Sequence, residues 1–383
     1  MDFALTPEQT LIIDTVRRFV DTELVPHEEE IERTGSVPAE LAATIKQKAI
    51  EAGIYAANMP ADLGGGGLDS VTMVLVEKEL GKTSYGLHYI VARPSNILRA
   101  CRGDQIDRYL IPTIRGDRVE CLAMSEPDAG SDLRGMKCRA ERDGDQYVIN
   151  GTKHFISHAD VADYVILFAA TDQDEKGRKR ITAFFVDKET PGFDAVDGYQ
   201  SVSHRGYQNM ILNFDDCRVP TDQILGEEHG GLEVANQWLG STRLQVAATC
   251  VGRAERALRL ATEWASTRTQ FGQKIGKFQG VSFKLADMAT RLQSAELLTL
   301  RAAWKVEQGE ATDAEIAMAK LAATEMLAFV ADEAIQIFGG MGLMAELPLE
   351  RLWRDARVER IWDGTSEIQR HIISRALLRP LGG

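Results

Sequence analysis

The stretch YVINGTKHFIS, residues 147–157, decides the fold class of this chain. β-Branched and aromatic residues, which favour strands, stand on both sides of Asn150-Gly151. Because Asn-Gly readily adopts the positive φ angles of a tight turn, the stretch predicts a β-hairpin. Similar runs, separated by turn residues, follow at residues 164–168, 181–186 and 210–214. We therefore predict a small, mostly antiparallel β-domain over residues 117–225.

The residues before this β-type region predict an N-terminal helical domain, residues 1–116. Thr6, Pro7 and Gln9 supply an N-cap hydroxyl, a proline at the first helical position and the glutamine of a capping box. Apolar residues follow at helical spacing and predict an amphipathic helix. They are Leu11, Ile12, Val16, Phe19, Val20 and Leu24. Further helical stretches lie at residues 39–52, 71–80 and 105–114.

The residues after the β-type region predict a C-terminal helical bundle, residues 226–383. Four long stretches are rich in Ala, Leu and Glu and nearly free of Pro, which suits packed antiparallel helices. They lie at residues 247–264, 282–308, 313–338 and 366–377. The predicted fold class is therefore mostly α with a central β-domain.

Length and composition exclude several classes of protein. The chain has 383 residues, 44% hydrophobic and 26% charged, as in a globular protein of two or three domains. No stretch reaches about 18 uninterrupted apolar residues, and the start MDFALTPEQT lacks the features of a signal peptide. Five cysteines without a CxxC spacing suit a reducing compartment. We therefore expect a cytoplasmic protein with structural thiols and no membrane partner.

Net charge and missing motifs narrow the chemistry. A net charge of -13 disfavours nucleic acid, yet a few arginines could still hold a small phosphorylated cofactor. There is no P-loop, HExxH, GxSxG, or GxGxxG between a strand and a helix. Phosphoryl transfer, zinc proteolysis, elbow-type hydrolysis and Rossmann-type dinucleotide binding therefore lose support. His154 and His158 stand four residues apart without a third ligand, so we predict no metal site.

Three local patterns are more informative. Small residues and hydroxyls at residues 124–132 let backbone amides approach a planar or phosphorylated ligand, although an ordinary polar loop has the same composition. Residues 268–272 and 336–342 each end a helix in a glycine-containing turn. Such turns could hold anionic oxygens, and they also occur as simple helix C-caps.

In this order along the chain, these patterns resemble the acyl-CoA dehydrogenase family of flavoproteins. The resemblance covers essentially the whole chain. Its motifs lie at residues 60–65, 125–132, 150–153, 205–206, 214–220, 268–272, 338–342 and 363–370. The family's fold has an N-terminal helical domain, a central β-domain and a C-terminal four-helix bundle, which agrees with the three regions predicted above.

The resemblance implies an FAD site at the junction of the β-domain and the C-terminal helices. Met124 and Ser125 are expected to contact the isoalloxazine ring from one loop. Phe155 is expected to pack on the ring, and Ser157 is expected to lie near its reactive N5. Ser131 is expected near the pyrophosphate or the bound CoA.

The resemblance divides the remaining FAD contacts between two subunits. Thr365 and Gln369 are expected to contribute from the same chain. The expected contacts from a neighbouring subunit to the adenosine diphosphate moiety are Arg268, Phe271, Gln279, Gln336 and Gly340. A shared site implies dimers paired into a homotetramer. The family's activity also implies an acyl-CoA substrate and a soluble electron-transfer flavoprotein as electron acceptor.

The resemblance makes Asp363 the base of the reaction. A thioester loses its α-proton to the base and its β-hydrogen, as hydride, to flavin N5. Most relatives carry Glu in a Tyr-Glu-Gly-Thr context, whereas this chain reads IWDGT at residues 361–365. The shorter stem withdraws the carboxylate by about 1.5 Å, and a displacement of that order can slow a reaction about a hundredfold. Some relatives place Glu just before an Arg in the third region, where this chain has Thr242.

Asp363 therefore supports several interpretations. In the first, Asp363 deprotonates an α-branched or alicyclic acyl-CoA, whose bulk near Cα fills the place of the missing methylene. In the second, it deprotonates an ordinary acyl-CoA in an adjusted pose. In the third, it serves other carbon-acid chemistry, as in nitroalkane oxidases. Alternatively, the chain is a catalytically silent FAD-binding or CoA-binding homologue in which Asp363 only caps the following helix. We favour the α-branched or alicyclic substrate.

The resemblance also implies contacts to the substrate. Arg243 matches the family's Arg near the CoA arm, but the position three before it, often Asp, is Gly240. In the first region, Tyr85, His88 and Arg93 fall where relatives line the acyl-tail pocket, although a surface helix face explains them at least as well. The residues expected around the substrate are Ser131, Thr242, Arg243, Gly364, Tyr85 and His88.

Overall fold

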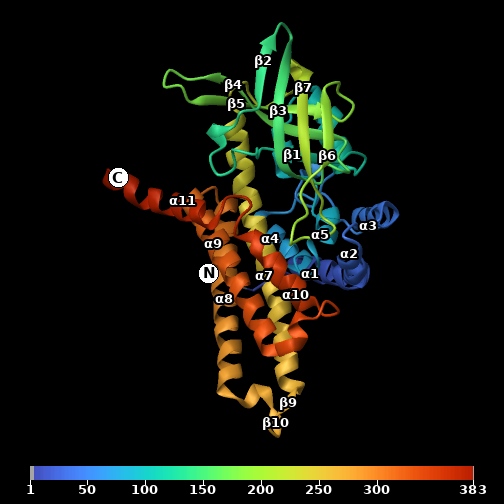
Figure 1. Cartoon of the computed structure of the whole chain (residues 1–383), viewed down its shortest axis with the longest axis vertical. Coiled ribbons are helices and arrows are strands. Elements are labelled where there is room, and N and C mark those ends of the chain that lie inside the picture. Colours follow the sequence, from blue (N-terminus) through green and yellow to red (C-terminus); the bar gives the residue numbers. More distant parts are fainter. Residues whose placement is uncertain (1–3, 383) are drawn as a thin grey trace.

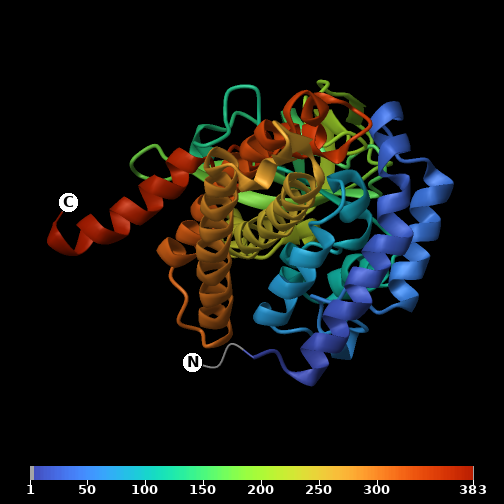
Figure 2. The same cartoon turned by 90° about the horizontal axis from the view of Figure 1, so that it is seen from below.

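The computed structural model describes residues 4–382 and contains a sheet, a helical bundle and a layer of N-terminal helices. In Figure 1 the sheet lies at one end of the long axis and the bundle extends to the other end. Figure 2 shows the N-terminal helices along one side of the bundle. The predicted fold class, mostly α with a central β-domain, is confirmed.

The N-terminal part begins with helix α1 (Pro7–Phe19), and its predicted capping box is confirmed. The Thr6 hydroxyl accepts a hydrogen bond from the main-chain N–H of Gln9, whose side chain accepts one from Thr6 N–H. The helices that follow are α2 (Glu28–Thr34), α3 (Ala39–Glu51), α4 (Ser70–Leu80), α5 (Tyr85–Val91) and α6 (Ile111–Ile114), which continues a π turn over Ile106–Leu110. Their buried residues share one core with the sheet.

The central sheet has eight strands in the order β6-β7-β3-β2-β4-β5-β8, with β1 beside β4. Pairs β1–β4 and β2–β4 are parallel, and the others are antiparallel, so the mostly antiparallel prediction is confirmed. The strands are β1 (Glu120–Ala123), β2 (Arg139–Asp143), β3 (Gln146–Ser157), β4 (Tyr164–Gln173), β5 (Lys179–Asp187), β6 (Phe193–Asp197), β7 (Asn209–Pro220) and β8 (Ile224–Leu225).

The predicted hairpin at Asn150-Gly151 is wrong, because β3 continues through both residues. Residues on both sides of this dipeptide pair with β7, and the register shifts there. Gly151 has a φ of 148°, and a Cβ atom on it would lie 2.6 Å from Cα of Cys138. Asn150-Gly151 therefore marks a bulge that the residue just before β2 approaches closely. The tight turn lies earlier, at Gly144 and Asp145, between β2 and β3.

The C-terminal part is built on α7 (Gly231–Thr267), which runs from the sheet to the far end of the bundle (Figure 1). A small hairpin of β9 (Thr269–Gln270) and β10 (Gln273–Lys274) follows it. The other helices are α8 (Gln279–Glu307), α9 (Asp313–Phe338), α10 (Pro348–Glu359) and α11 (Ser366–Leu378). Helices α7, α8 and α9 contact one another along an Ala-rich core, and α11 projects from the bundle.

Two expectations from composition bear on this fold. All five cysteines are buried and unpaired, as expected of thiols that are mostly structural. Among residues 4–382, no helix combines the length and the apolar character needed to cross a membrane.

Candidate active site

Asp363 lies in the turn between α10 and α11, with its main chain held by two other helices. The carbonyl oxygen of Asp363 accepts a hydrogen bond from Arg243 Nε of α7 at 3.1 Å. It also accepts one from Gln369 Nε2 of α11 at 3.3 Å, and the same amide reaches the Gly364 carbonyl at 2.8 Å. Asp363 has a φ of 52°, a left-handed conformation that Asp tolerates better than most residues do. Contacts from α7 and α11 thus fix the turn.

Lys320 of α9 provides a third attachment for this turn. Its side chain is fully buried, and Nζ donates hydrogen bonds to the carbonyls of Glu359, Trp362 and Gly364 at 2.7, 2.9 and 2.9 Å. Burial lowers the pKa of Lys320 below its ordinary value, while Asp363 and Glu359 raise it. The ammonium therefore binds the main chain both before and after Asp363.

The carboxylate of Asp363 is available for chemistry. It has no hydrogen-bond partner among residues 4–382, and its main-chain N–H has no acceptor in that part of the chain either. Burial is the largest cause that raises the pKa of Asp363, to about 6; Glu359 also raises it, whereas Lys320 and Arg243 lower it. Such a carboxylate accepts a proton near neutral pH more readily than an ordinary Asp does.

The interpretation of Asp363 as a helix cap is wrong. The N-cap of α11 is Thr365, whose hydroxyl accepts a hydrogen bond from Ile368 N–H at 3.2 Å. Gly364 separates Asp363 from this cap and has a φ of 93°. A Cβ atom on Gly364 would lie 2.8 Å from Gln369 Nε2, so the turn requires glycine there.

Aromatic rings form a continuous cluster beside Asp363. The ring of Trp362 lies 4.9 Å from Tyr85 and 4.8 Å from His204. Tyr85 stacks on His204 at 4.4 Å and meets the edge of Tyr207 at 4.9 Å. Tyr85, Tyr207 and Trp362 are half-buried, so the cluster presents part of its surface to solvent. An apolar group of a ligand placed beside Asp363 would therefore contact aromatic rings.

A buried charge cluster supports these rings from behind. The Glu359 carboxylate pairs with Arg253, lies 3.2 Å from His204 Nε2 and accepts a hydrogen bond from Trp362 Nε1 at 2.8 Å. Burial alone would raise the pKa of Glu359, but Arg253 and His204 hold it down at about 2. Glu359 therefore stays ionised and fixes the orientation of Trp362.

The ring cluster continues to the end of strand β3. Tyr89 meets Tyr207 at 4.7 Å and His158 at 4.8 Å. His158 directly follows Ser157, the last residue of β3. The rings therefore connect the surroundings of Asp363 with the strand end on which we expect the flavin ring.

The predicted flavin-ring residues come together at the ends of β1 and β3. Ser125 accepts a hydrogen bond through its carbonyl from His154 N–H at 2.9 Å. The Met124 carbonyl accepts one from the buried Lys153, which also pairs with the buried Glu126 at 2.7 Å. Among the predicted residues here, Met124 is buried, Ser125 and Ser157 are half-buried, Ser131 is exposed, and Phe155 is 60% exposed.

The residues predicted to contact the adenosine diphosphate moiety gather at the end of the bundle that lies away from the sheet. They lie at the end of α7, in the β9–β10 hairpin, at the start of α8 and at the end of α9, far from the sheet in Figure 1. Trp264 stacks on Phe338 at 4.6 Å and joins the ends of α7 and α9. The five residues are Arg268, Phe271, Gln279, Gln336 and Gly340, and all are exposed.

The predicted acyl-pocket residues are not on a surface helix face, so that alternative is wrong. Tyr85 belongs to the ring cluster, whereas His88 is fully buried behind it and bonds Glu77 through Nε2 at 2.9 Å. Arg93 is buried too, paired with Glu120 at 2.6 Å and placed 4.5 Å from the centre of the Tyr89 ring. Only Tyr85 of the three is partly open to solvent.

Several residues of the site were missed in the sequence. They are Lys320, Arg253, Glu359, His204, Tyr207 and Tyr89. Lys320 carried a signal, because it stands among buried neighbours at helical spacing, including Ile316, Ala317 and Ala323. A single cation on an apolar helix face requires a partner from another element. The other residues had no such signal, because their partners are distant in sequence.

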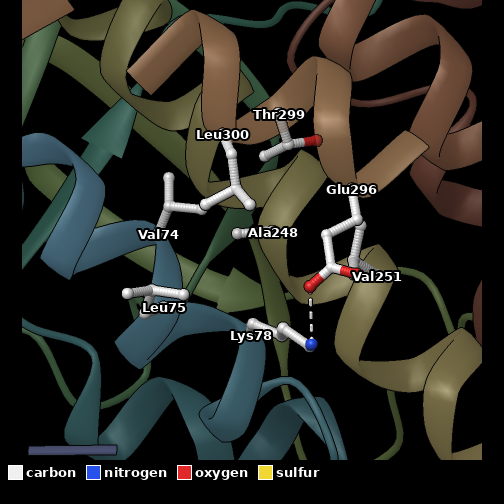
Figure 3. A pocket seen from close by; sticks show the side chains of 8 residues that line it. All are labelled: Val74, Leu75, Lys78, Ala248, Val251, Glu296, Thr299 and Leu300. Atoms are coloured by element: carbon white, nitrogen blue, oxygen red, sulfur yellow. Dashed lines mark hydrogen bonds and ion pairs between the residues drawn. The ribbon is translucent and has the colours of Figure 1, made fainter. Parts of the chain in front are cut away.

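Figure 3 shows a small cavity elsewhere that does not form part of the site. It has a volume of about 10 Å³, which accommodates roughly one water molecule. Aliphatic side chains line most of it, and its charged members, Lys78 and Glu296, pair with each other at 2.7 Å. The cavity lies between α4, α7 and α8 and suits packing rather than binding.

Comparison with known proteins identifies the class to which this fold and site belong. The chain matches the N-terminal, middle and C-terminal domains described for acyl-CoA dehydrogenase over residues 6–117, 121–217 and 229–378. The chain therefore belongs to the acyl-CoA dehydrogenase family. It is an oxidoreductase that uses FAD.

Individual relatives cover nearly the whole chain. The short-chain specific acyl-CoA dehydrogenase of Homo sapiens mitochondria is 38% identical over 96% of this chain and 90% of that protein. Butyryl-CoA dehydrogenase from Megasphaera elsdenii is 35% identical, with a TM-score of 0.92 over 99% of this chain and 100% of that one. PigA, whose structure was solved with FAD and proline, shares 31% sequence identity with this chain, with a TM-score of 0.92 over 100% of both chains.

The residues present fit FAD. Phe155 offers an exposed ring beside the Ser125 loop, with a φ of 57° that turns it out of the strand. Gln369 is fully buried, and its Oε1 has no hydrogen-bond partner among residues 4–382. A buried acceptor of this kind requires a donor, which a hydroxyl or N–H group of the cofactor can supply.

Proposed function

We propose that this chain desaturates an acyl-CoA thioester between Cα and Cβ, with Asp363 as the base that removes the α-proton. The observation that carries this proposal is the partly buried, unpartnered carboxylate of Asp363, with a pKa raised to about 6. A general base works best when its pKa is close to the working pH.

The residues of this chain divide the work of the reaction. The carboxylate of Asp363 accepts the α-proton, and its free N–H can donate a hydrogen bond to the thioester oxygen as negative charge develops there. FAD, when bound, supplies the acceptor for the β-hydride. We propose that Met124, Ser125, Ser131, Phe155, Ser157, Thr365 and Gln369 hold it from the same chain.

We propose a compact acyl group that is α-branched or alicyclic. The stem of Asp363 is one methylene shorter than that of Glu, so bulk at Cα brings the α-proton within its reach. The rings of Tyr85, Tyr207 and Trp362 lie together beside Asp363, and in this proposal they form the wall against which a compact acyl group packs. Two relatives bear short-chain and butyryl-CoA names, and PigA has been solved with proline, a ring compound.

We propose that the CoA thioester lies along the start of α7 and the Asp363 turn. Arg243 binds the Asp363 carbonyl through Nε only, so its remaining N–H groups are available to the CoA arm. Thr242 beside it is half-buried, and Gly364 allows the main chain to approach the thioester. Tyr85 is the wall residue that contacts the acyl group, whereas His88 positions Tyr85 from behind.

We also propose a homotetramer that passes electrons to a soluble electron-transfer flavoprotein in the cytoplasm. Exposed apolar side chains support the assembly, because a lone subunit would leave them in water. Phe271 is 94% exposed at the bundle end, and Leu381, just after α11, is 84% exposed. The neighbouring subunit would then supply Arg268, Phe271, Gln279, Gln336 and Gly340 to the FAD site.

Anaerobic titration with straight, branched and cyclic acyl-CoAs tests this function, with flavin absorbance as the readout. We expect bleaching, fastest with branched or cyclic thioesters. Asp363→Asn should keep FAD and ligand binding but abolish bleaching, because the shape stays and the base is lost. Asp363→Glu should shift the preference toward linear thioesters.

Three outcomes would contradict the proposal. Bleaching by Asp363→Asn at the wild-type rate would assign the base elsewhere. Peroxide formation from a nitroalkane, with no response to acyl-CoAs, would indicate an oxidase. FAD binding without bleaching by any thioester would indicate a silent homologue.

A further inference from the structure

Among residues 4–382, Lys320 is the one side chain that binds main-chain groups on both sides of Asp363. It projects from the first half of α9, whereas Asp363 lies 43 positions later in the turn after α10. Nζ contacts the carbonyl oxygens of Glu359, Trp362 and Gly364 at 2.7, 2.9 and 2.9 Å. An ammonium has three N–H donors, so these acceptors use all of them.

The three carbonyls need such a donor. Glu359 is the last residue of α10, where main-chain carbonyls lack partners within the helix and carry partial negative charge. Trp362 and Gly364 stand on either side of Asp363, whose φ of 52° turns the chain sharply. A buried carbonyl without a partner is costly, so without Lys320 the turn would have to rearrange toward water.

Other attachments of the turn do not replace Lys320. Arg243 and Gln369 bind the carbonyl of Asp363 itself, and Gln369 shares the Gly364 carbonyl. The carbonyl of Trp362 has Lys320 as its only side-chain donor among residues 4–382. Loss of Lys320 would therefore free the chain at the residue just before the base.

We propose that Lys320 is a positioning residue for catalysis: by binding the carbonyls on both sides of Asp363, it fixes where the carboxylate and the main-chain N–H of Asp363 point. This inference rests on the proposed function, in which that carboxylate removes the α-proton. Both groups must meet the same thioester, so a small rotation of the turn displaces both at once. A displacement of about 1 Å can slow such a step about a hundredfold.

The charge of Lys320 also acts on Asp363, together with the other charged and titratable groups facing it. These come from four elements: Lys320 from α9, Arg243 from α7, Glu359 from α10 and Tyr85 from α5. Removing Lys320 takes away the larger of the two positive charges that lower the pKa of Asp363, so only Arg243 then opposes the effects of burial and of Glu359. The pKa that governs flavin reduction should therefore move upward, to higher pH.

Lys320→Met tests the proposal in the FAD-loaded enzyme. Methionine is one atom shorter than lysine and suits a buried position, but it removes the charge and all three donors. We expect flavin reduction by the best acyl-CoA to slow about a hundredfold, and its pH profile to move upward. FAD content and the Kd of a non-reducible CoA thioether should stay close to wild type.

Lys78→Met provides the matched control. Lys78 is a half-buried lysine paired with Glu296 (Figure 3) and with Glu255, and its ammonium has no hydrogen bond or ion pair to residues 359–364. We expect it to lower thermal stability while leaving the rate and pH profile of flavin reduction unchanged. Equal rates in Lys320→Met and Lys78→Met would overturn the positioning role.

Amide hydrogen exchange gives a readout that does not depend on activity. Residues 361–365 should exchange faster in Lys320→Met than in wild type, and at the wild-type rate in Lys78→Met. If Asp363→Asn reduces flavin normally, the proposed function fails, and exchange alone decides whether Lys320 holds the turn. Unchanged exchange would overturn the proposal. If Lys320→Met does not fold, Lys320→Gln, which keeps an amide donor, undergoes the same measurements.

Discussion

Two carboxylates four residues apart illustrate how much environment decides the role of a residue. Glu359 and Asp363 are both enclosed by protein, yet the pKa of Glu359 is about 2 and that of Asp363 is about 6. Arg253, His204 and Trp362 all bind the Glu359 carboxylate, whereas no side chain among residues 4–382 forms a hydrogen bond or ion pair with that of Asp363. The paired acid is structural, and the unpaired acid is free to accept a proton.

The raised pKa predicts the pH dependence of flavin reduction. Only ionised Asp363 accepts the α-proton, so the rate with saturating acyl-CoA should rise with pH through about 6 and become constant above it. Anaerobic stopped-flow absorbance between about pH 5 and pH 8 measures this profile. A flat profile over that range would contradict the assignment of Asp363 as the base.

Thermal unfolding provides an independent test of the raised pKa of Asp363. The ordinary value for Asp is 3.8 and the folded value is about 6, so the folded protein binds an extra proton between them. The contribution of Asp363 to the free energy of unfolding is therefore full below the ordinary value and is lost as pH rises through about 6. Asp363→Asn should remove this trend, so its Tm should rise relative to wild type over that interval.

At the residue scale, Asp363 could be singled out from the sequence as the candidate base, but the residues that hold its turn could not. Asp363 stands in a recognisable motif, IWDGT at residues 361–365, and needs no distant partner to be noticed. Lys320 acts through three carbonyls that lie 39 or more positions away, and spacing along the chain does not reveal such contacts. His88 is fully buried, which its sequence context did not indicate. The roles assigned to the FAD and CoA residues remain predictions.

At the element scale, strand β3 shows why local patterns misled. Asn-Gly favours a tight turn when the chain is free to reverse, but here the apolar alternation on both sides matches the partner strand β7. Pairing along both halves of β3 outweighs the local preference of two residues, which then form a bulge. The helices were easier to predict, because capping residues such as Thr6 and an apolar face act locally.

Gly151→Ala tests this account of β3. The added Cβ would lie 2.6 Å from Cα of Cys138 and 2.9 Å from its Sγ, at a φ of 148°. Crowding and backbone strain together should lower the free energy of unfolding by about 3 kcal/mol. Urea unfolding followed by circular dichroism measures the change.

The matched control for this substitution is Gly177→Ala. Gly177 has a φ of 73°, but a Cβ added there would have nothing within 4 Å, so the position carries strain without crowding. We expect a loss of about 1 kcal/mol there. Equal losses at the two glycines would contradict the close approach of Cys138.

At the scale of the whole molecule, the predicted FAD contacts occupy opposite ends of one chain. The residues expected on the flavin ring lie at the end of β3, and those expected on the adenosine diphosphate lie near the β9–β10 hairpin (Figure 1). The fold of the single chain keeps the two sets apart, which favours a site completed by a second copy. The homotetramer and the domain boundaries at residues 116 and 225 remain predictions.

Phe271→Ala tests the shared site. Phe271 is 94% exposed in the subunit, so its loss should not affect folding. We expect FAD affinity to fall by about tenfold or more, with partial dissociation of the oligomer, because buried aromatic anchors dominate interfaces. Sedimentation velocity and flavin fluorescence measure the two effects.

Leu11→Ala is the control for this substitution. Leu11 is also exposed, at 69%, but lies on α1, away from the bundle end. It should change neither FAD affinity nor the sedimentation profile. A monomeric wild-type enzyme that keeps FAD at full affinity would contradict the shared site.

The length of α7 has a consequence for how the holoenzyme responds to dilution. With 37 residues it spans about 55 Å as one rod and fixes the separation of the two half-sites in each subunit. Neither half can bend toward the other, so with the shared site proposed above one molecule of FAD would bridge two copies. FAD binding and subunit association are then one coupled equilibrium. A low concentration of FAD should therefore favour dissociation of the oligomer, as a low concentration of protein does.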